Sequence, residues 1–324
     1  MIKKIALLLV GVMTAAQLFA ASPLRGELKP AQSPATTATP VHIGFYPVSV
    51  YEMEMGSNTF YADLYMWLKW KGDLDPVASL EFTNMVEEWG KQQEGLKAEP
   101  QVLPDGSKYM ILKIEGRFVQ PFDLRNYPLD RQQLSIRVED SVNTAEQVVF
   151  VIDQENTALG ANLQIPGWAL SGWSGQVFEH DYKSNLGEAG ASSTYSSAQF
   201  NMHIERSTSY FLWKLLMPLV IVLIAALSAL ILSPKSIDAR TALPGGALLT
   251  AIFLQMGYSD ALPELAYLIL MDKIYLVAYI MIVLTLVRAI VTFQRCEQAN
   301  PTDIQRMLKT DKQLMVVQLL AVLL

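Results

Sequence analysis

The chain has 324 residues, enough for two domains, and its 51% hydrophobic and 17% charged residues are typical of an integral membrane protein. The formal net charge of -6 argues against nucleic-acid binding, and the single cysteine, Cys296, excludes an intrachain disulfide. The sequence lacks metal-ligand spacing, a nucleophile elbow and a phosphate loop. We therefore expect no enzyme, no catalytic residues, no metal site and no cofactor.

Residues 1–21 have the pattern of a secretory signal peptide. Two lysines precede a short apolar run, and small residues follow at Ala20 and Ala21. The run is shorter than the roughly 20 residues of a membrane span, although an uncleaved anchor helix is an alternative. Residues 22–40 hold four prolines among serine, threonine and alanine, which predicts a flexible linker.

Residues 41–206 alternate apolar and polar side chains in short runs separated by turn signals. Thr59–Trp70 and Gln147–Ile152 are two such runs, and Pro104–Ser107 has the composition of a hairpin turn. About ten strands of this kind predict an immunoglobulin-like antiparallel β-sandwich.

Residues 207–324 are expected to form a transmembrane α-helical bundle. The predicted helices lie at about 210–233, 240–259, 267–293 and, incompletely, 312–324. Basic residues lie in the link between the first two helices and after the third, so both regions are expected in the cytoplasm. The chain is then a multi-pass protein of the plasma (inner) membrane with its β-domain on the periplasmic or extracellular side.

One face of the second predicted helix carries side chains spaced three or four residues apart. They are Ala242, Gly246, Leu249, Phe253, Met256 and Asp260. Several copies around an axis would place hydrophobic rings at Leu249 and Phe253, which can close a pore by excluding water. A packing seam within one helix bundle would show the same spacing, so periodicity alone leaves both interpretations open.

A motif in the β-domain bears on this choice. Asp123 begins the sequence Asp-Leu-Arg-Asn-Tyr-Pro-Leu-Asp-Arg-Gln, within a stretch that runs from Gln120 to Leu134. It resembles the signature loop of the pentameric ligand-gated ion channels, the Cys-loop receptor superfamily. Gln120 and Leu134 occupy the positions of the flanking cysteines, as in the prokaryotic branch. The segment from Arg240 to Pro263 is similar to the pore helix of that family, although Pro244-Gly245-Gly246 departs from its pattern and suggests a kink.

The resemblance implies a homopentamer with a central pore. The pore-lining residues that it implies are Asp238, Ala242, Gly246, Leu249, Phe253, Met256 and Asp260. Rings of Asp238 and Asp260 would attract monovalent cations, whereas Arg240 would favour anions if it faced the lumen. The resemblance also implies an Asp130–Arg206 salt bridge that couples the two domains. The coupling residues are then Asp123, Tyr127, Pro128, Asp130, Arg206 and Pro263.

The family binds its ligands between neighbouring β-sandwiches, in an aromatic box that suits cationic amines. The corresponding residues are Tyr65, Trp67, Phe82, Glu139, Tyr182 and Tyr195. Thr83 aligns as well as Phe82, and an aromatic side chain on a strand is more often part of the core.

We therefore expect a cation-selective channel, in contact with membrane lipid, that a small extracellular ligand opens, with an amine favoured. A proton-gated channel of the same fold and a non-conducting membrane-tethered sensor are the alternatives.

Overall fold

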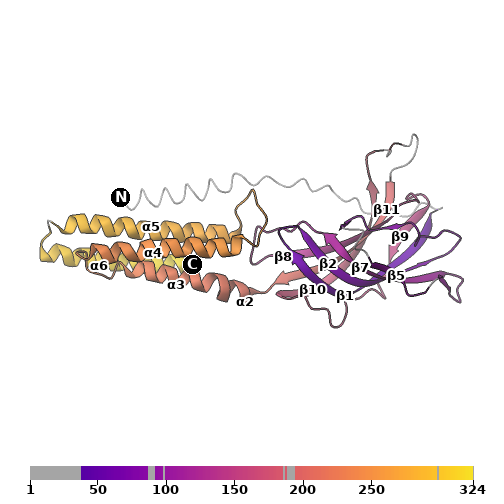
Figure 1. The fold of residues 1–324 in the computed structure, drawn as a ribbon, viewed down its shortest axis with the longest axis horizontal. Helices are drawn as coiled ribbons and strands as arrows, with labels where there is room; N and C mark the ends of the chain where they lie inside the picture. Colours follow the sequence, from indigo (N-terminus) through magenta and orange to yellow (C-terminus); the bar gives the residue numbers. More distant parts are fainter. Residues whose placement is uncertain are drawn as a thin grey trace. The chain divides into compact units, whose positions relative to one another are not determined.

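The computed structural model describes residues 38–86, 92–97, 99–184, 187, 194–297 and 299–323. The predicted signal peptide and nearly all of the predicted linker lie outside these ranges. Two compact units are present (Figure 1). The first is built from strands, and the second comprises the helices together with Leu124–Asp130 of the signature loop.

Eleven strands make up the described part of the first unit. They are β1 (Thr39–Glu54), β2 (Thr59–Trp70), β3 (Leu80–Glu81), β4 (Met85–Val86), β5 (Gln92–Gly95), β6 (Gln101–Val102), β7 (Lys108–Val119), β8 (Arg131–Asp140), β9 (Val148–Ile152), β10 (Trp168–Asp181) and β11 (Thr194–Arg206). One sheet has the order β4-β7-β2-β1-β9, with β5 and β6 also paired to β7, and the other has the order β10-β11-β8-β3. This arrangement confirms the predicted β-sandwich.

Alternation along the strands produces the core between the sheets. Side chains of β2 are buried at every second position, as the period of two in a strand requires. Phe45 of β1 and Phe200 of β11 stack across the two sheets with their ring centroids 5.1 Å apart. The pairing of β1 with β9 is parallel, so the sandwich is not purely antiparallel as the sequence suggested.

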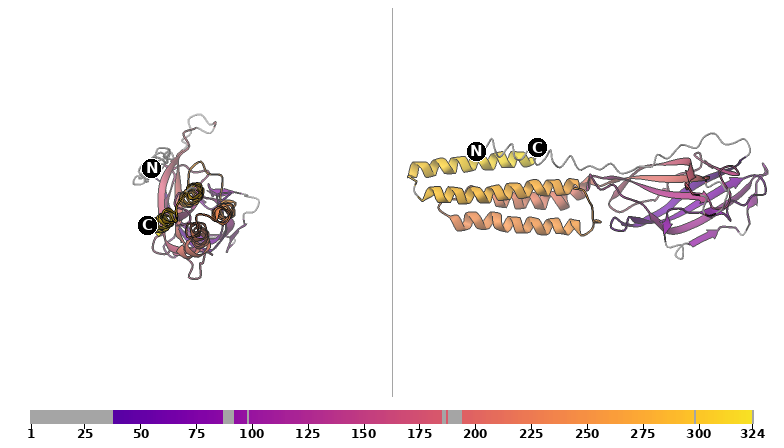
Figure 2. Two further views of the ribbon diagram at one scale, coloured as in Figure 1. Left: turned by 90° about the vertical axis from the view of Figure 1, so that its left-hand side faces the viewer. Right: turned by 90° about the horizontal axis from the view of Figure 1, so that it is seen from above.

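The helices of the second unit run side by side (Figure 2). The first membrane segment consists of α2 (Thr208–Tyr210), the π-helical η2 (Phe211–Leu216) and α3 (Met217–Ser228). It is followed by α4 (Ile237–Ser259), α5 (Leu270–Cys296) and α6 (Pro301–Leu323). The first three of these helical segments, Thr208–Ser228, α4 and α5, are long and apolar enough to cross a membrane.

Two helix predictions need correction. The first segment ends at Ser228 rather than near residue 233. The last helix begins at Pro301 rather than near residue 312, because its polar first half is helical although it lacks the hydropathy of a membrane span. Pro244 lies inside α4, which runs as one helix from Ile237 to Ser259, and a kink there stays a prediction.

Candidate functional site

The second membrane helix, α4, has two distinct faces. Its buried face consists of Arg240, Pro244, Ala247, Ala251 and Tyr258, and the helix contacts α3 and α5. Each predicted pore-lining residue is exposed: Asp238, Ala242, Gly246, Leu249, Phe253, Met256 and Asp260. The stripe is therefore not a packing seam within the chain's own bundle.

The exposed stripe is apolar in its middle and acidic at both ends. Leu249 is 56% exposed and Phe253 is 62% exposed, large fractions for such side chains in a helix bundle. Asp238 lies in the first turn of α4, and Asp260 directly follows its last residue. The helix dipole favours a carboxylate at the first position and disfavours one at the second. The Asp260 carboxylate therefore does not stabilise α4 through the helix dipole, which favours a role for this carboxylate other than helix stabilisation.

Arg240 does not share this exposed face. Its side chain is fully buried and donates hydrogen bonds to the Ala229 carbonyl oxygen at 3.1 Å and to Thr292 Oγ1 at 3.1 Å. The guanidinium also pairs with the Asp311 carboxylate of α6. In this structure the positive charge near the start of α4 is therefore held among the helices.

The predicted ion pair joins Asp130, near the tip of the signature loop, to Arg206, at the end of β11. Arg206 Nε lies 2.7 Å from Asp130 Oδ1, and Arg206 Nη2 lies 3.3 Å from Asp130 Oδ2. Asp130 is 2% exposed, and the Arg206 guanidinium carbon lies 4.8 Å from the centroid of the Tyr127 ring. Burial, followed by the nearby Tyr210, raises the pKa of Tyr127, so its hydroxyl stays neutral. The pair is thus largely shielded from water.

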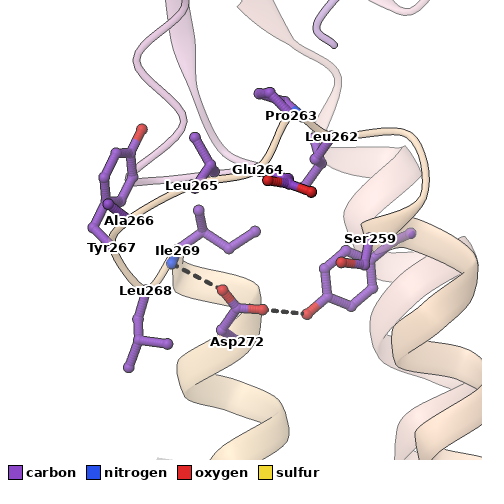
Figure 3. Close-up of a pocket in the computed structure, with 11 residues that line it drawn as sticks. Ser259, Leu262, Pro263, Glu264, Leu265, Ala266, Tyr267, Leu268, Ile269 and Asp272 are labelled. Atoms are coloured by element: carbon purple, nitrogen blue, oxygen red, sulfur yellow. Dashed lines mark hydrogen bonds between the residues drawn. The ribbon is translucent and has the colours of Figure 1, made fainter.

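The same tip contacts the loop between α4 and α5. Figure 3 shows the residues of that loop. The Leu124 N–H donates to the Tyr267 hydroxyl at 3.4 Å, and the Leu270 N–H donates to the Arg125 carbonyl oxygen at 2.9 Å. Tyr127 and Tyr258 stack with their ring centroids 6.3 Å apart. The loop is therefore held at both of its ends by the signature loop.

Asp272 organises the start of α5 beside this loop. It accepts hydrogen bonds from the Tyr258 hydroxyl at 2.8 Å and from the Ile269 N–H at 3.2 Å. The loop encloses a pocket of about 400 Å³ that Pro263 helps to line. Of the other predicted coupling residues, Pro128 is buried. Asp123 is exposed in the first unit and accepts a hydrogen bond from Gln132 Nε2 at its carbonyl oxygen, 2.8 Å away.

Three predicted ligand residues gather at one end of the β10-β11-β8-β3 sheet. Glu139 of β8 is 3% exposed and accepts a hydrogen bond from the Tyr182 hydroxyl at 3.0 Å. The rings of Tyr182 and Tyr195 meet edge to face with centroids 5.8 Å apart. Burial and the neighbouring Glu139 carboxylate raise the pKa of Tyr182, which keeps its hydroxyl protonated as a donor. The other side of the cluster is formed by His180, whose Nδ1 lies 2.5 Å from Glu139 Oε1.

The sequence did not single out His180. The centroid of its ring lies 4.2 Å from that of Tyr182. Both side chains contact the Glu139 carboxylate, and Tyr195 packs against Tyr182. The signal was present in the sequence, because His180 and Tyr182 are two residues apart and so fall on the same side of an extended chain. We call Glu139, His180, Tyr182 and Tyr195 the acid–aromatic cluster.

Tyr65 and Trp67 lie on the other sheet, in a separate concave pocket of about 500 Å³. Its lining includes Tyr46, Tyr65, Trp67, Lys69, Tyr109, Asp153 and Asn156. Trp67 Nε1 donates to Asp153 Oδ2 at 3.0 Å. Burial alone would raise the pKa of Asp153, but hydrogen bonds from Trp67 and Asn156 and the proximity of His42 lower it. The pocket therefore combines aromatic faces with an ionised carboxylate.

Phe82 belongs to neither group. It is 5% exposed and packs edge to face against Phe118, with ring centroids 6.0 Å apart. This core position does not support the assignment of Phe82 to the ligand site, which stays a prediction. The described chain thus carries two aromatic sites on different sheets rather than one closed box.

Known proteins resemble this chain over half or more of its length. The proton-gated ion channel of Gloeobacter violaceus is 21% identical over 293 residues, which cover 84% of this chain and 78% of that protein. A glutamate-gated chloride channel of Drosophila melanogaster is 28% identical over 170 residues, 51% of this chain and 35% of that protein. A Drosophila gamma-aminobutyric acid receptor subunit beta-like protein is 24% identical over 53% of this chain and 33% of its own length. No model of a known protein family matches the chain.

The match therefore spans about a third of the length of these animal relatives and most of the Gloeobacter channel. These relationships confirm the resemblance seen in the sequence: the chain is a relative of the pentameric ligand-gated ion channels. The relatives are ion channels and receptor subunits rather than enzymes. The chain is a multi-pass membrane protein with an extracellular β-sandwich.

Proposed function

We propose that the chain forms a homopentameric, cation-selective ion channel that a small extracellular amine opens by binding between subunits. The observation that carries the proposal is the exposed face of α4, which is apolar at Leu249 and Phe253 and acidic at Asp238 and Asp260. Five copies of this face around an axis would enclose a pore whose middle excludes water and whose mouths attract cations.

The proposed preference for cations over anions depends on the position of Arg240 as much as on the carboxylates of Asp238 and Asp260. The Drosophila relative named as a chloride channel makes anion conduction a real competitor. A basic ring at the inner mouth would favour anions, but the Arg240 guanidinium is buried and paired with Asp311. With that charge withheld from the exposed face, Asp238 dominates the potential at the mouth.

The acid–aromatic cluster supports a cationic ligand. Its Glu139 carboxylate is nearly fully buried and has the Tyr182 hydroxyl and His180 Nδ1 as partners, so an acidic group lies beside aromatic rings. Aromatic faces beside it attract ammonium groups. The Trp67 pocket on the opposite sheet offers a second aromatic surface with an acid, Asp153. In a ring of identical subunits the cluster of one chain would face the Trp67 pocket of the next, which completes a box that a single chain lacks.

Proton gating is the second candidate, and the His180–Glu139 contact is the observation that favours it. The His180 ring lies against a nearly buried carboxylate, and the two form an ion pair only when the imidazole is protonated. The Gloeobacter relative is named as proton-gated. A non-conducting sensor is a third candidate, which purified particles of one or two chains would favour over a pentamer.

Voltage-clamp recording separates these candidates. Primary amines are applied at constant pH, and pH steps are then applied without amine. Glu139→Gln should weaken amine activation by about 1–3 kcal/mol, which raises the half-maximal concentration about 5- to 150-fold. Tyr195→Ala should act similarly, whereas Tyr195→Phe keeps the ring face and should be mild.

Glu179→Gln is the matched control, because Glu179 is an exposed neighbour of His180 in β10 and its replacement changes the charge by the same amount. A channel that opens on acidification, ignores every amine and responds normally in Glu139→Gln, Tyr195→Ala and Tyr195→Phe would remove the amine site. Proton gating would then have to depend on groups other than the His180–Glu139 pair.

A further inference from the structure

A buried ion cluster joins α4, α5, α6 and the residue that follows α3. Asp311 of α6 lies at its centre and is fully buried. It pairs with the Arg240 guanidinium of α4 and accepts a hydrogen bond from Arg288 Nε of α5 at 2.7 Å. Arg240 also donates to Thr292 of α5 and to the Ala229 carbonyl oxygen just after α3. One carboxylate therefore holds two guanidinium groups in the interior.

The two arginines depend on Asp311 to different degrees. The Arg288 side chain is 23% exposed and already reaches solvent, whereas Arg240 is fully enclosed. An arginine side chain cannot shed its proton in a protein. Without Asp311, Arg240 would remain charged in the interior with another cation, Arg288, nearby. The long Arg240 side chain can avoid this burial of an unpaired charge by turning its guanidinium to water, as arginines near helix ends do.

The start of α4 is open to solvent on the face that carries Asp238. Arg240 and Asp238 are two residues apart near the start of α4, so they lie at the same end of the helix but on different faces, Arg240 buried and Asp238 exposed. A released Arg240 guanidinium that turned to water at this end would bring a positive charge to the mouth that Asp238 makes negative and would oppose the effect of its carboxylate. The potential of the inner mouth would lose the feature that attracts cations.

We propose that Asp311 is a positioning residue for ion selectivity: it keeps Arg240 inside the helix bundle and so leaves the inner mouth to Asp238. The inference rests on the proposed channel function. It also gives a reason for a carboxylate in the interior of α6, since this helix lies outside the pore face and Asp311 would act only through Arg240.

The test measures reversal potentials in a NaCl gradient. Asp311→Asn should shift the reversal potential from the sodium towards the chloride equilibrium value, and Asp311→Glu should restore most of it. The double variant Asp311→Asn, Arg240→Gln should also return towards sodium, because the released charge is gone. A purely structural role of Asp311 would reduce the number of channels without moving the reversal potential. Asp303→Asn, an equal charge change in the first turn of the same helix, should leave it unchanged.

Arg240→Gln alone keeps the inference testable where Asp311→Asn fails to assemble. A sequestered Arg240 contributes nothing at the mouth, so its neutralisation should leave the reversal potential unchanged. A clear shift in that variant, or conducting Asp311→Asn channels with the wild-type reversal potential, would overturn the inference while the channel function stands. A wild type without current, or with a chloride current, would instead contradict the proposed function and the inference with it.

Discussion

The Asp130–Arg206 pair is predicted to transmit ligand binding to the helices, and its geometry fixes how large the effect of breaking it should be. The Asp130 side chain is 1% exposed and the Arg206 side chain 14%, with two contacts of 2.7 and 3.3 Å. Removing one partner of a buried pair costs about 3–5 kcal/mol, because the other charge is left without compensation. Arg206 retains slight exposure and the Tyr127 ring, so we expect a value near 3 kcal/mol for Asp130→Asn.

A double-mutant cycle separates the pair from its surroundings. Asp130→Asn, Arg206→Gln and the double variant are compared for thermal stability of the purified protein and for agonist concentration dependence. If breaking the pair destabilises the closed and the open channel equally, only the thermal stability changes. If it destabilises one state more than the other, the agonist concentration dependence changes as well. A gating difference of about 3 kcal/mol would shift the equilibrium about 150-fold.

The neighbouring Arg131–Glu205 pair provides a matched control. Its atoms approach to 3.1 Å, but its side chains are 79% and 41% exposed. Such surface pairs contribute at most about 1 kcal/mol. The coupling reasoning is refuted if Asp130→Asn and Arg206→Gln have additive effects, or if the exposed pair shows an equally large interaction energy.

Two further predictions concern the pore. Leu249→Ser should raise spontaneous or ligand-evoked opening, because a polar ring no longer excludes water, and an open probability at or below that of the wild type would show that Leu249 does not line the constriction. Neutralising both acidic ends with Asp238→Asn and Asp260→Asn should move the reversal potential away from the sodium equilibrium value. An unchanged reversal potential would mean that these carboxylates do not set selectivity.

The sequence was most informative where a local period determines which side of an element is buried. The spacing of Leu249, Phe253 and Met256 predicted one helix face, and the structure exposes that face and buries the opposite one. The signature loop likewise led to the Asp130–Arg206 pair, because Asp130 lies in the motif and the resemblance implied Arg206, the last charge before the first membrane helix, as its partner.

The sequence was least informative where distant parts of the chain decide the outcome. Phe82 follows the short strand β3, and a shift of one residue turns a side chain from the surface into the core. The polar first half of α6 concealed the helix start at Pro301, since the described partners of Asp311 are arginines of α4 and α5, far from it in the sequence. His180 was passed over because its partner Glu139 is distant in sequence.

The reversal potential of ligand-evoked current through the wild-type protein, measured in a NaCl gradient, tests the central claim most directly. An exposed α4 face with Asp238 and Asp260 at its ends and Arg240 held inside predicts a value close to the sodium equilibrium potential. A value close to the chloride equilibrium potential would contradict the assignment of this face as a cation pathway. Pentameric protein that carries no current under amines or acid would contradict the channel itself.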